Sequence, residues 1–161
     1  MGKKSKKIDI ISIVIFAVLI VALAMTIVGI CIDWTTSEIF NVKGSSTLSE
    51  LLESQKKLVD MGADPNTTFN TNAAFSIMTI IFTGLTTIAF AAKLFVKNKM
   101  VKFVTLILAA LSIVCAVVAI STIYSYLSDL KTGISVGAGP WLLFAFGVLG
   151  GAAGVVGALK K

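Results

Sequence analysis

Four long apolar runs, separated by polar segments, dominate the chain. The first run, "IISIVIFAVLIVALAMTIVGICI", carries no charged residue between Asp9 and Asp33. Each run is close to the ~20 residues that a helix needs to cross the hydrocarbon core of a bilayer. Because open strands cannot span lipid, the pattern predicts four transmembrane helices, at about residues 9–32, 73–95, 103–126 and 140–159. The predicted fold class is an all-α integral membrane protein with a single four-span domain over residues 1–161.

A water-soluble helix is predicted in the first long connection, residues 33–72. In "TLSELLESQKKLVDMGADP", Thr47 and Glu50 form a T-x-x-E capping box, and Gly62 followed by Pro65 marks the end. The spacing predicts an amphipathic helix over about 47–61 with the apolar face Leu48, Leu51, Leu52, Leu58 and Val59. Three placements of that face are open: against the protein's own helices, against a partner or neighbouring subunit, or on the outer lipid surface.

The segment before this helix, "DWTTSEIFNVKG", is rich in β-prone residues and is a candidate short strand or hairpin. Its Trp34 suits the membrane interface just outside the first span. After the helix, Asn66-Thr67-Thr68 forms a glycosylation sequon, which has meaning only in a eukaryotic source. The first connection therefore holds more local structure than a simple loop.

Lysine supplies all 14 basic residues of a chain that is 57% hydrophobic, with a mean hydropathy of +0.97. Four crossings place ten lysines on one side: Lys3, Lys4, Lys6, Lys7, Lys93, Lys97, Lys99, Lys102, Lys160 and Lys161. The other side receives Lys43, Lys56, Lys57 and Lys131. The positive-inside rule then predicts cytoplasmic termini and a cytoplasmic loop at 96–102, with the connections 33–72 and 127–139 outside the cell membrane. The net charge of +6 reflects this orientation rather than a nucleic-acid partner.

Catalytic and metal-binding patterns are missing from the sequence. The chain has no histidine and no arginine, and both cysteines, Cys31 and Cys115, lie in apolar runs. No Asp, Glu or Lys lies deep in a span, where proton relays and ion-coupled transporters place such groups. We expect a non-enzyme without metal or cofactor. A cleaved signal peptide is an alternative for the first run, because Ala22-Leu23-Ala24 resembles a cleavage site, although the run is long for one.

Small and hydroxylated residues line one face of each span. In the fourth span, overlapping G-x-x-x-G pairs make Gly147, Gly150, Gly151 and Gly154 candidate contacts, either within the bundle or between subunits. A candidate polar seam on the second and third spans consists of Thr79, Thr83, Thr86, Ser112 and Thr122. The roughly sevenfold repeat of these seams predicts a left-handed bundle. The hydroxyls suit either structural hydrogen bonds or a polar conduit.

This layout resembles the claudins and related tetraspan families in topology over the whole chain: a long first outer connection with a Trp near its start, a short second one and a small-residue-rich fourth span. The resemblance implies a four-helix membrane fold. The claudin W…G-L-W-C-C pattern is reduced to Trp34, and the first connection favours a helix over a sheet. The barrier-forming activity of claudins therefore transfers to no residue here. Large-pore channel subunits share the topology, but usually have disulfide-bonded outer loops.

The function predicted from these features is a structural, assembly or adhesion role through self-association or partner binding. The contact surfaces would be the apolar face of the 47–61 helix and the glycines of the fourth span. Two alternatives remain open, a channel or pore-forming subunit lined by the hydroxyl seam, and a small immunity or accessory protein that binds one membrane partner. The expected partners are the lipid bilayer and either further copies of the chain or another membrane protein.

Overall fold

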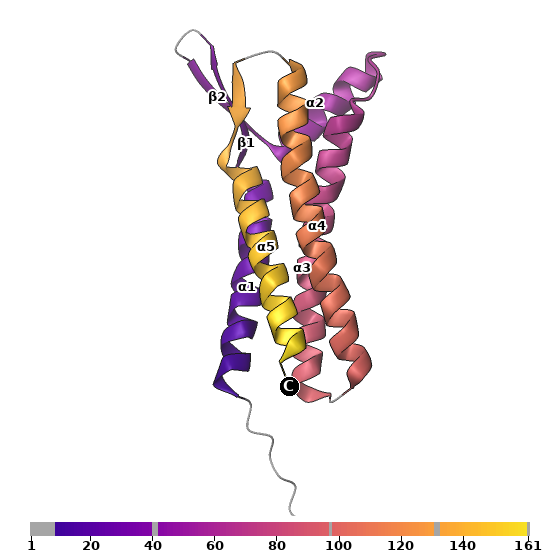
Figure 1. Ribbon diagram of the computed structural model, residues 1–161. Helices are drawn as coiled ribbons and strands as arrows, with labels where there is room; N and C mark the ends of the chain where they lie inside the picture. Colours follow the sequence, from indigo (N-terminus) through magenta and orange to yellow (C-terminus); the bar gives the residue numbers. More distant parts are fainter. Residues whose placement is uncertain (1–8, 40–41, 97, 131–132, 161) are drawn as a thin grey trace, which may run out of the picture.

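The computed structural model describes residues 9–39, 42–96, 98–130 and 133–160. Its frame is four long helices, each long and apolar enough to cross a membrane: α1 (Ile10–Cys31), α3 (Thr67–Phe95), α4 (Lys99–Leu130) and α5 (Ala138–Leu159) (Figure 1). The four predicted helices are confirmed, and they support a multi-pass membrane protein with a tetraspan topology. A shorter helix, α2 (Leu48–Asp60), confirms the amphipathic helix expected at about 47–61.

Two of the spanning helices are longer than their apolar runs. The Asn66 side chain accepts the Phe69 amide at 2.9 Å, so α3 begins at Thr67 rather than near Ala73. Helix α4 likewise continues to Leu130, past the expected end near Tyr126. With 29 and 32 residues against 22 each in α1 and α5, α3 and α4 are roughly 10–15 Å longer. Their extra turns rise past the ends of α1 and α5 at one end of the bundle (Figure 1).

A three-stranded antiparallel sheet fills the space above α1 and α5 at that end, which we call the sheet end. Its strands are β1 (Asp33–Ile39), β2 (Val42–Thr47) and β3 (Ile134–Val136), in the order β2-β1-β3. Thr36 pairs with Ser45 on one side and with Ser135 on the other. The hairpin suggested by the β-prone segment is confirmed. The predicted all-α fold class therefore omits a small sheet. Strand β3, from the distant connection between α4 and α5, pairs with the second edge of β1.

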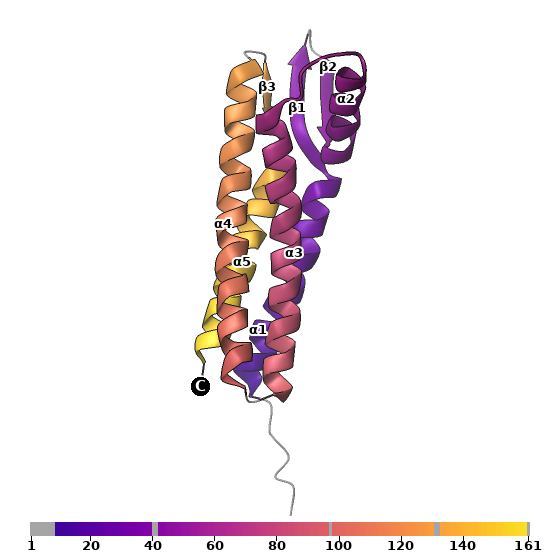
Figure 2. The same cartoon turned by 90° about the vertical axis from the view of Figure 1, so that its right-hand side faces the viewer.

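The first connection was expected to favour a helix over a sheet. It contains the helix, but it also contains two strands of the sheet, so the expectation that a sheet is disfavoured there is wrong. Helix α2 follows β2 directly and rises beside it (Figure 2). Its predicted capping box is present: the Thr47 amide donates to Glu50 Oε2 at 2.8 Å, and the Glu50 amide donates to Thr47 Oγ1 at 3.4 Å. Gly62, at φ 93°, follows the helix end in the left-handed conformation that glycine favours.

The largest core cluster joins the sheet end to the bundle. It contains Trp34, Leu48, Phe69, Ala73, Ala119, Ile123, Tyr126 and Leu143. Trp34, which the sequence suggested for the membrane interface, is buried inside the protein with 0% of its surface exposed, so it does not present its indole to lipid or water. The extended turns of α3 and α4 enclose the indole, and Asn72 accepts its Nε1–H at 3.2 Å. A buried tryptophan whose N–H has an acceptor can contribute its whole apolar surface to the core.

Candidate functional site

The glycines of α5 form a close contact with neighbouring helices of the bundle. Gly147, Gly150, Gly151 and Gly154 are all buried. A Cβ atom at Gly147, Gly150 or Gly154 would lie 2.7, 3.0 or 2.5 Å from the methyl group of a threonine on α3. The three threonines are, in the same order, Thr79, Thr83 and Thr86. Each glycine therefore receives one threonine methyl, which brings α3 and α5 close together along parallel courses.

Gly151 faces a different neighbour. A Cβ atom there would collide with the Ile113 side chain and stand 2.8 Å from the Ala109 carbonyl oxygen of α4. Of the two placements open from the sequence, the structure therefore shows contact within one bundle. The glycine surface is filled by α3, α4 and, at Gly150, by Ala22 of α1, so a second copy could reach it only if the bundle opened.

The candidate polar seam lies in the same interface. Each of Thr79, Thr83 and Thr86 donates its hydroxyl to the carbonyl one turn earlier in α3, over 2.7–2.8 Å. Thr83 and Ser112 also share a hydrogen bond of 2.8 Å, and Ser112 reaches the Gly147 carbonyl oxygen at 3.3 Å. Among the described residues, no buried side-chain nitrogen or oxygen lacks a hydrogen-bond partner. In this state the seam is a packed helix interface, and a conduit along it would require these contacts to separate.

Thr122 belongs to a separate network near the sheet end. It bonds back to its own helix and accepts from the Asn72 amide nitrogen at 3.2 Å. The same nitrogen donates to the Ala119 carbonyl oxygen at 2.6 Å, while Asn72 Oδ1 accepts from Trp34. The fully buried Asn72 side chain thus joins β1 to α4. The apolar run begins only at Ala73, so the sequence pattern puts Asn72 at the end of the loop and does not indicate that its side chain bridges β1 and α4.

The close approach of α1 to α5 is a second feature that the sequence does not reveal. A Cβ atom at Gly29 would stand 3.0 Å from the Gly139 carbonyl oxygen, and one at Gly139 would stand 2.5 Å from that of Gly29. The Gly137 amide donates to the Trp34 carbonyl oxygen at 2.9 Å, which connects the start of α5 to the sheet. Glycine is needed at these positions because two backbones nearly touch.

The apolar face of α2 is divided along its length. Leu48 is 3% exposed, and the half-buried Leu51 packs on the same core cluster. Further along, Leu52, Leu58 and Val59 are 37%, 47% and 39% exposed. The first turn of α2 therefore packs on the protein's own core, as one placement predicts. The exposed apolar patch of α2, defined as Leu52, Leu58 and Val59, stays uncovered in the single chain.

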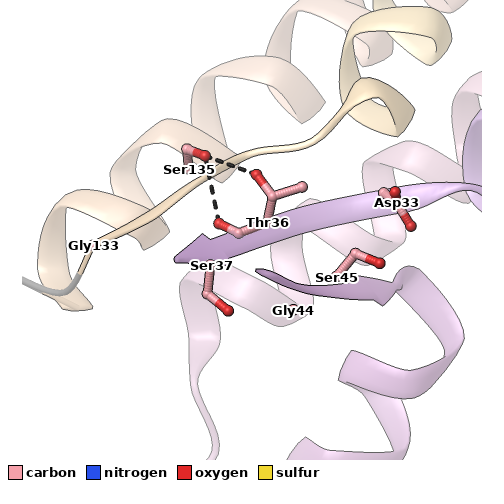
Figure 3. Close-up of a pocket in the computed structure, with 7 residues that line it drawn as sticks. All are labelled: Asp33, Thr36, Ser37, Gly44, Ser45, Gly133 and Ser135. Carbon is pink, nitrogen blue, oxygen red and sulfur yellow. Dashed lines mark hydrogen bonds between the residues drawn. The ribbon is translucent and has the colours of Figure 1, made fainter. Parts of the chain in front are cut away.

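A polar depression lies on the sheet, with a volume of about 440 Å³ (Figure 3). Its lining is Asp33, Thr36, Ser37, Gly44, Ser45, Gly133 and Ser135. Thr36 and Ser135 face each other with a hydroxyl–hydroxyl distance of 2.8 Å. Such a lining can hydrogen-bond water or small polar molecules. The described residues contain no group of three or more His, Cys, Asp or Glu side chains that could hold a metal ion.

The opposite end of the bundle, which we call the lysine end, is closed by side-chain contacts. The Lys93 ammonium donates to the carbonyl oxygens of Gly157, Ala158 and Lys160 and so caps the C-terminus of α5. Lys160 forms an ion pair with Asp9, whose side chain also accepts the Ile11 amide at the start of α1. The hydrogen bond from Lys160, followed by that from the Ile11 amide, holds the pKa of the Asp9 carboxyl below its ordinary value.

Comparison with protein-family models, with curated proteins and with solved structures gives no match for this chain. The tetraspan arrangement therefore rests on the helices themselves. Among the surfaces described above, the exposed apolar patch of α2 is the one least expected on an isolated protein surface.

Proposed function

We propose that the chain is a non-enzymatic tetraspan membrane protein that works by association with other proteins, first of all with further copies of itself. The exposed apolar patch of α2 carries this proposal. The first turn of α2 is anchored in the core cluster, so the helix presents its second half in a defined position. A positioned apolar patch outside the membrane spans is typical of a protein–protein contact.

The position of α2 favours a protein contact over a lipid contact. Helix α2 starts next to the end of α1 and rises beside β2, away from the membrane-spanning part of the bundle (Figure 2). Leu58 and Val59, near its far end, are therefore remote from the acyl chains. The opposite face carries both signs of charge, including the Glu53–Lys57 pair at 2.8 Å, whereas helices that lie on membranes usually have a basic polar face.

A two-fold axis along the membrane normal gives both copies the same orientation in the bilayer. Such an axis sets the two α2 helices side by side, with Leu58 and Val59 of each copy at the same height. Covering the exposed parts of Leu52, Leu58 and Val59 is worth roughly 1 kcal/mol each, because less than half of each side chain is exposed. A symmetric pair covers the patch twice, for a gross gain of roughly 6 kcal/mol. The loss of translational and rotational freedom on association offsets much of this gain, so the association should be weak and reversible.

Particle size in a mild detergent or in native membrane tests the proposal. Leu58→Asp should shift the protein toward the monomer while its melting temperature stays close to that of the parent chain, because Leu58 is already exposed. Lys57→Gln lowers the net charge by the same one unit on the opposite face of the helix, where the Lys57 side chain is exposed, and should leave particle size unchanged.

Other outcomes separate the remaining functions. A monomeric parent chain that captures one other membrane protein, with capture lost in Leu58→Asp, would replace self-association by an accessory role. A monomeric parent chain without such capture contradicts the proposal. Solute flux through liposomes that contain the purified protein would instead favour the channel alternative.

A further inference from the structure

The lysine end collects positive charge from three different segments. Four helix ends meet there: the start of α1, the end of α3, the start of α4 and the end of α5 (Figure 1). Among the described residues, this end carries Lys93, Lys99, Lys102 and Lys160. Asp9 is the one carboxylate that the sequence places there, since no Asp or Glu occurs between Asp64 and Asp129 or after Asp129.

Two of these charges are already occupied within the protein. Lys93 donates to three carbonyl oxygens at the end of α5, and Lys160 pairs with Asp9. Both side chains are therefore held in place and partly shielded. They join the helix ends to one another, and the two remaining lysines of this end are Lys99 and Lys102.

Lys99 and Lys102 are exposed, and no described carboxylate lies within ion-pair distance of either. They stand three residues apart at the start of α4, so their side chains share one face of the helix. Lys102 is also close enough to interact electrostatically with Lys93. Like charges gathered in this way repel each other, and the positive end of the α4 helix dipole lies at the same place. The arrangement is complementary to an anion.

Three large apolar side chains within four residues of Lys99 along the chain are also exposed. Phe95, Met100 and Phe103 are 75%, 72% and 64% exposed. They belong to the end of α3 and the first turns of α4, at the boundary of two membrane-spanning helices. A soluble anion would gain nothing from these neighbours. A phospholipid would, because its phosphate can reach the ammonium groups while its acyl chains cover the aromatic rings.

We propose that the start of α4 is a binding site for an anionic phospholipid, with Lys99 and Lys102 on the headgroup phosphate and Phe95 and Phe103 against the acyl chains. The alternative explanation of the same lysines is that they only set the orientation of the chain in the membrane. That explanation requires no preference among lipids, so the two can be separated. The site does not depend on self-association through α2.

Native mass spectrometry of the purified full chain, released from mixed micelles of phosphatidylglycerol and phosphatidylcholine, measures the preference directly. We expect the parent chain to retain phosphatidylglycerol selectively. A lysine near an anionic surface changes binding roughly fivefold, so Lys99→Gln with Lys102→Gln should weaken retention on the order of 25-fold. Lys56→Gln with Lys57→Gln, which removes the same charge from the other end, should leave it unchanged.

Three results would overturn the proposal. The first is equal retention of the two lipids by the parent chain. The second is an equal loss of phosphatidylglycerol in the two double variants. The third is full competition by inorganic phosphate, which would indicate a site for any small anion. Melting temperatures in phosphatidylcholine alone serve as the folding control, because the substitutions are at exposed positions and should not change stability when no anionic lipid is present.

Discussion

Replacing Gly147 by alanine adds one methyl group at the contact between α5 and its neighbours. The new Cβ atom would stand 2.7 Å from the Thr79 methyl carbon and 3.0 Å from the Ala116 Cβ atom, whereas carbon atoms in contact prefer 3.5–4.0 Å. Neither neighbour can turn away. An alanine Cβ has no torsion that would move it, and the Thr79 hydroxyl is held by its 2.8 Å bond to the Phe75 carbonyl oxygen. Helix α5 must therefore move away from α3 and α4.

Overpacking of this kind costs ~1–3 kcal/mol, and the better helix propensity of alanine over glycine offsets up to about 1 kcal/mol of it. We expect Gly147→Ala to lower the free energy of unfolding by roughly 1–2 kcal/mol. Thr79→Ser removes the colliding methyl but keeps the hydroxyl, so the double variant should recover part of the loss. The coupling between the two positions should fall in the range of ~0.5–3 kcal/mol found for residues in contact.

Unfolding in mixed micelles with increasing denaturing detergent, followed by circular dichroism, provides the measurement. Gly84→Ala is the matched control, because a Cβ atom at Gly84 meets its nearest neighbour, Leu23 Cδ1, at an ordinary 3.6 Å. That variant should be as stable as the parent chain or slightly more so. The packing of α5 on α3 described above is refuted if Gly147→Ala unfolds with the parent chain, or if Thr79→Ser restores nothing.

Three further predictions concern other parts of the molecule. Asn72→Ala leaves the buried Trp34 N–H without an acceptor and should cost ~1–3 kcal/mol, measured by the same unfolding titration. The pKa of Asp9 is lowered in the folded chain, so the stability that its carboxylate provides is present above its ordinary pKa and is lost as pH falls through the lowered value. In a plot of melting temperature against pH, Asp9→Asn should therefore reduce the fall at acid pH. Cysteine at Ser54 should react with an impermeant thiol reagent outside intact cells while cysteine at Asn98 should not, and the reverse labelling would invert the proposed orientation.

Local patterns carry most of what could be predicted from the sequence. The four spanning helices follow from uninterrupted apolar runs, and α2 follows from a capping box and a stop signal that lie within its own residues. The extra turns of α3 escape the same argument. "TTFNTN" is polar by composition, and only the Asn66 cap and the burial of Phe69 and Asn72 against α4 make it helical. Burial by a distant segment cannot be read from a window of neighbouring residues.

The sheet shows the same limit more clearly. β1 and β2 are adjacent in sequence, so their pairing was a reasonable expectation. β3 is a three-residue strand, and its partner β1 lies about a hundred positions earlier in the chain. Nothing within Ile134–Val136 distinguishes it from a loop. Its pairing depends on the start of α5 meeting the end of α1, through glycines whose role becomes visible only when the two backbones are seen together.

The glycine face of α5 packs inside the bundle, and the helices that cover it were not predictable from α5 alone. In retrospect, one clue was present. The stripe on α3 advances by four residues and then three, from Thr79 to Thr83 to Thr86. The stripe on α5 advances by three and then four, from Gly147 to Gly150 to Gly154. Two parallel helices can match such stripes over two turns, and the structure joins them in that order.

Occupation of the glycine face within the bundle changes where association should be sought. A helix surface filled by its own neighbours has no area left for a second copy, so the spanning helices lose the contact that their G-x-x-x-G pairs suggested. The apolar face of α2, in contrast, stays partly exposed. It had the features of a core face, yet only Leu48 and Leu51 contact the core, while Leu52, Leu58 and Val59 are exposed. The second half of α2 is held in place by the first and is left uncovered, so self-association should depend on these residues rather than on the spanning helices.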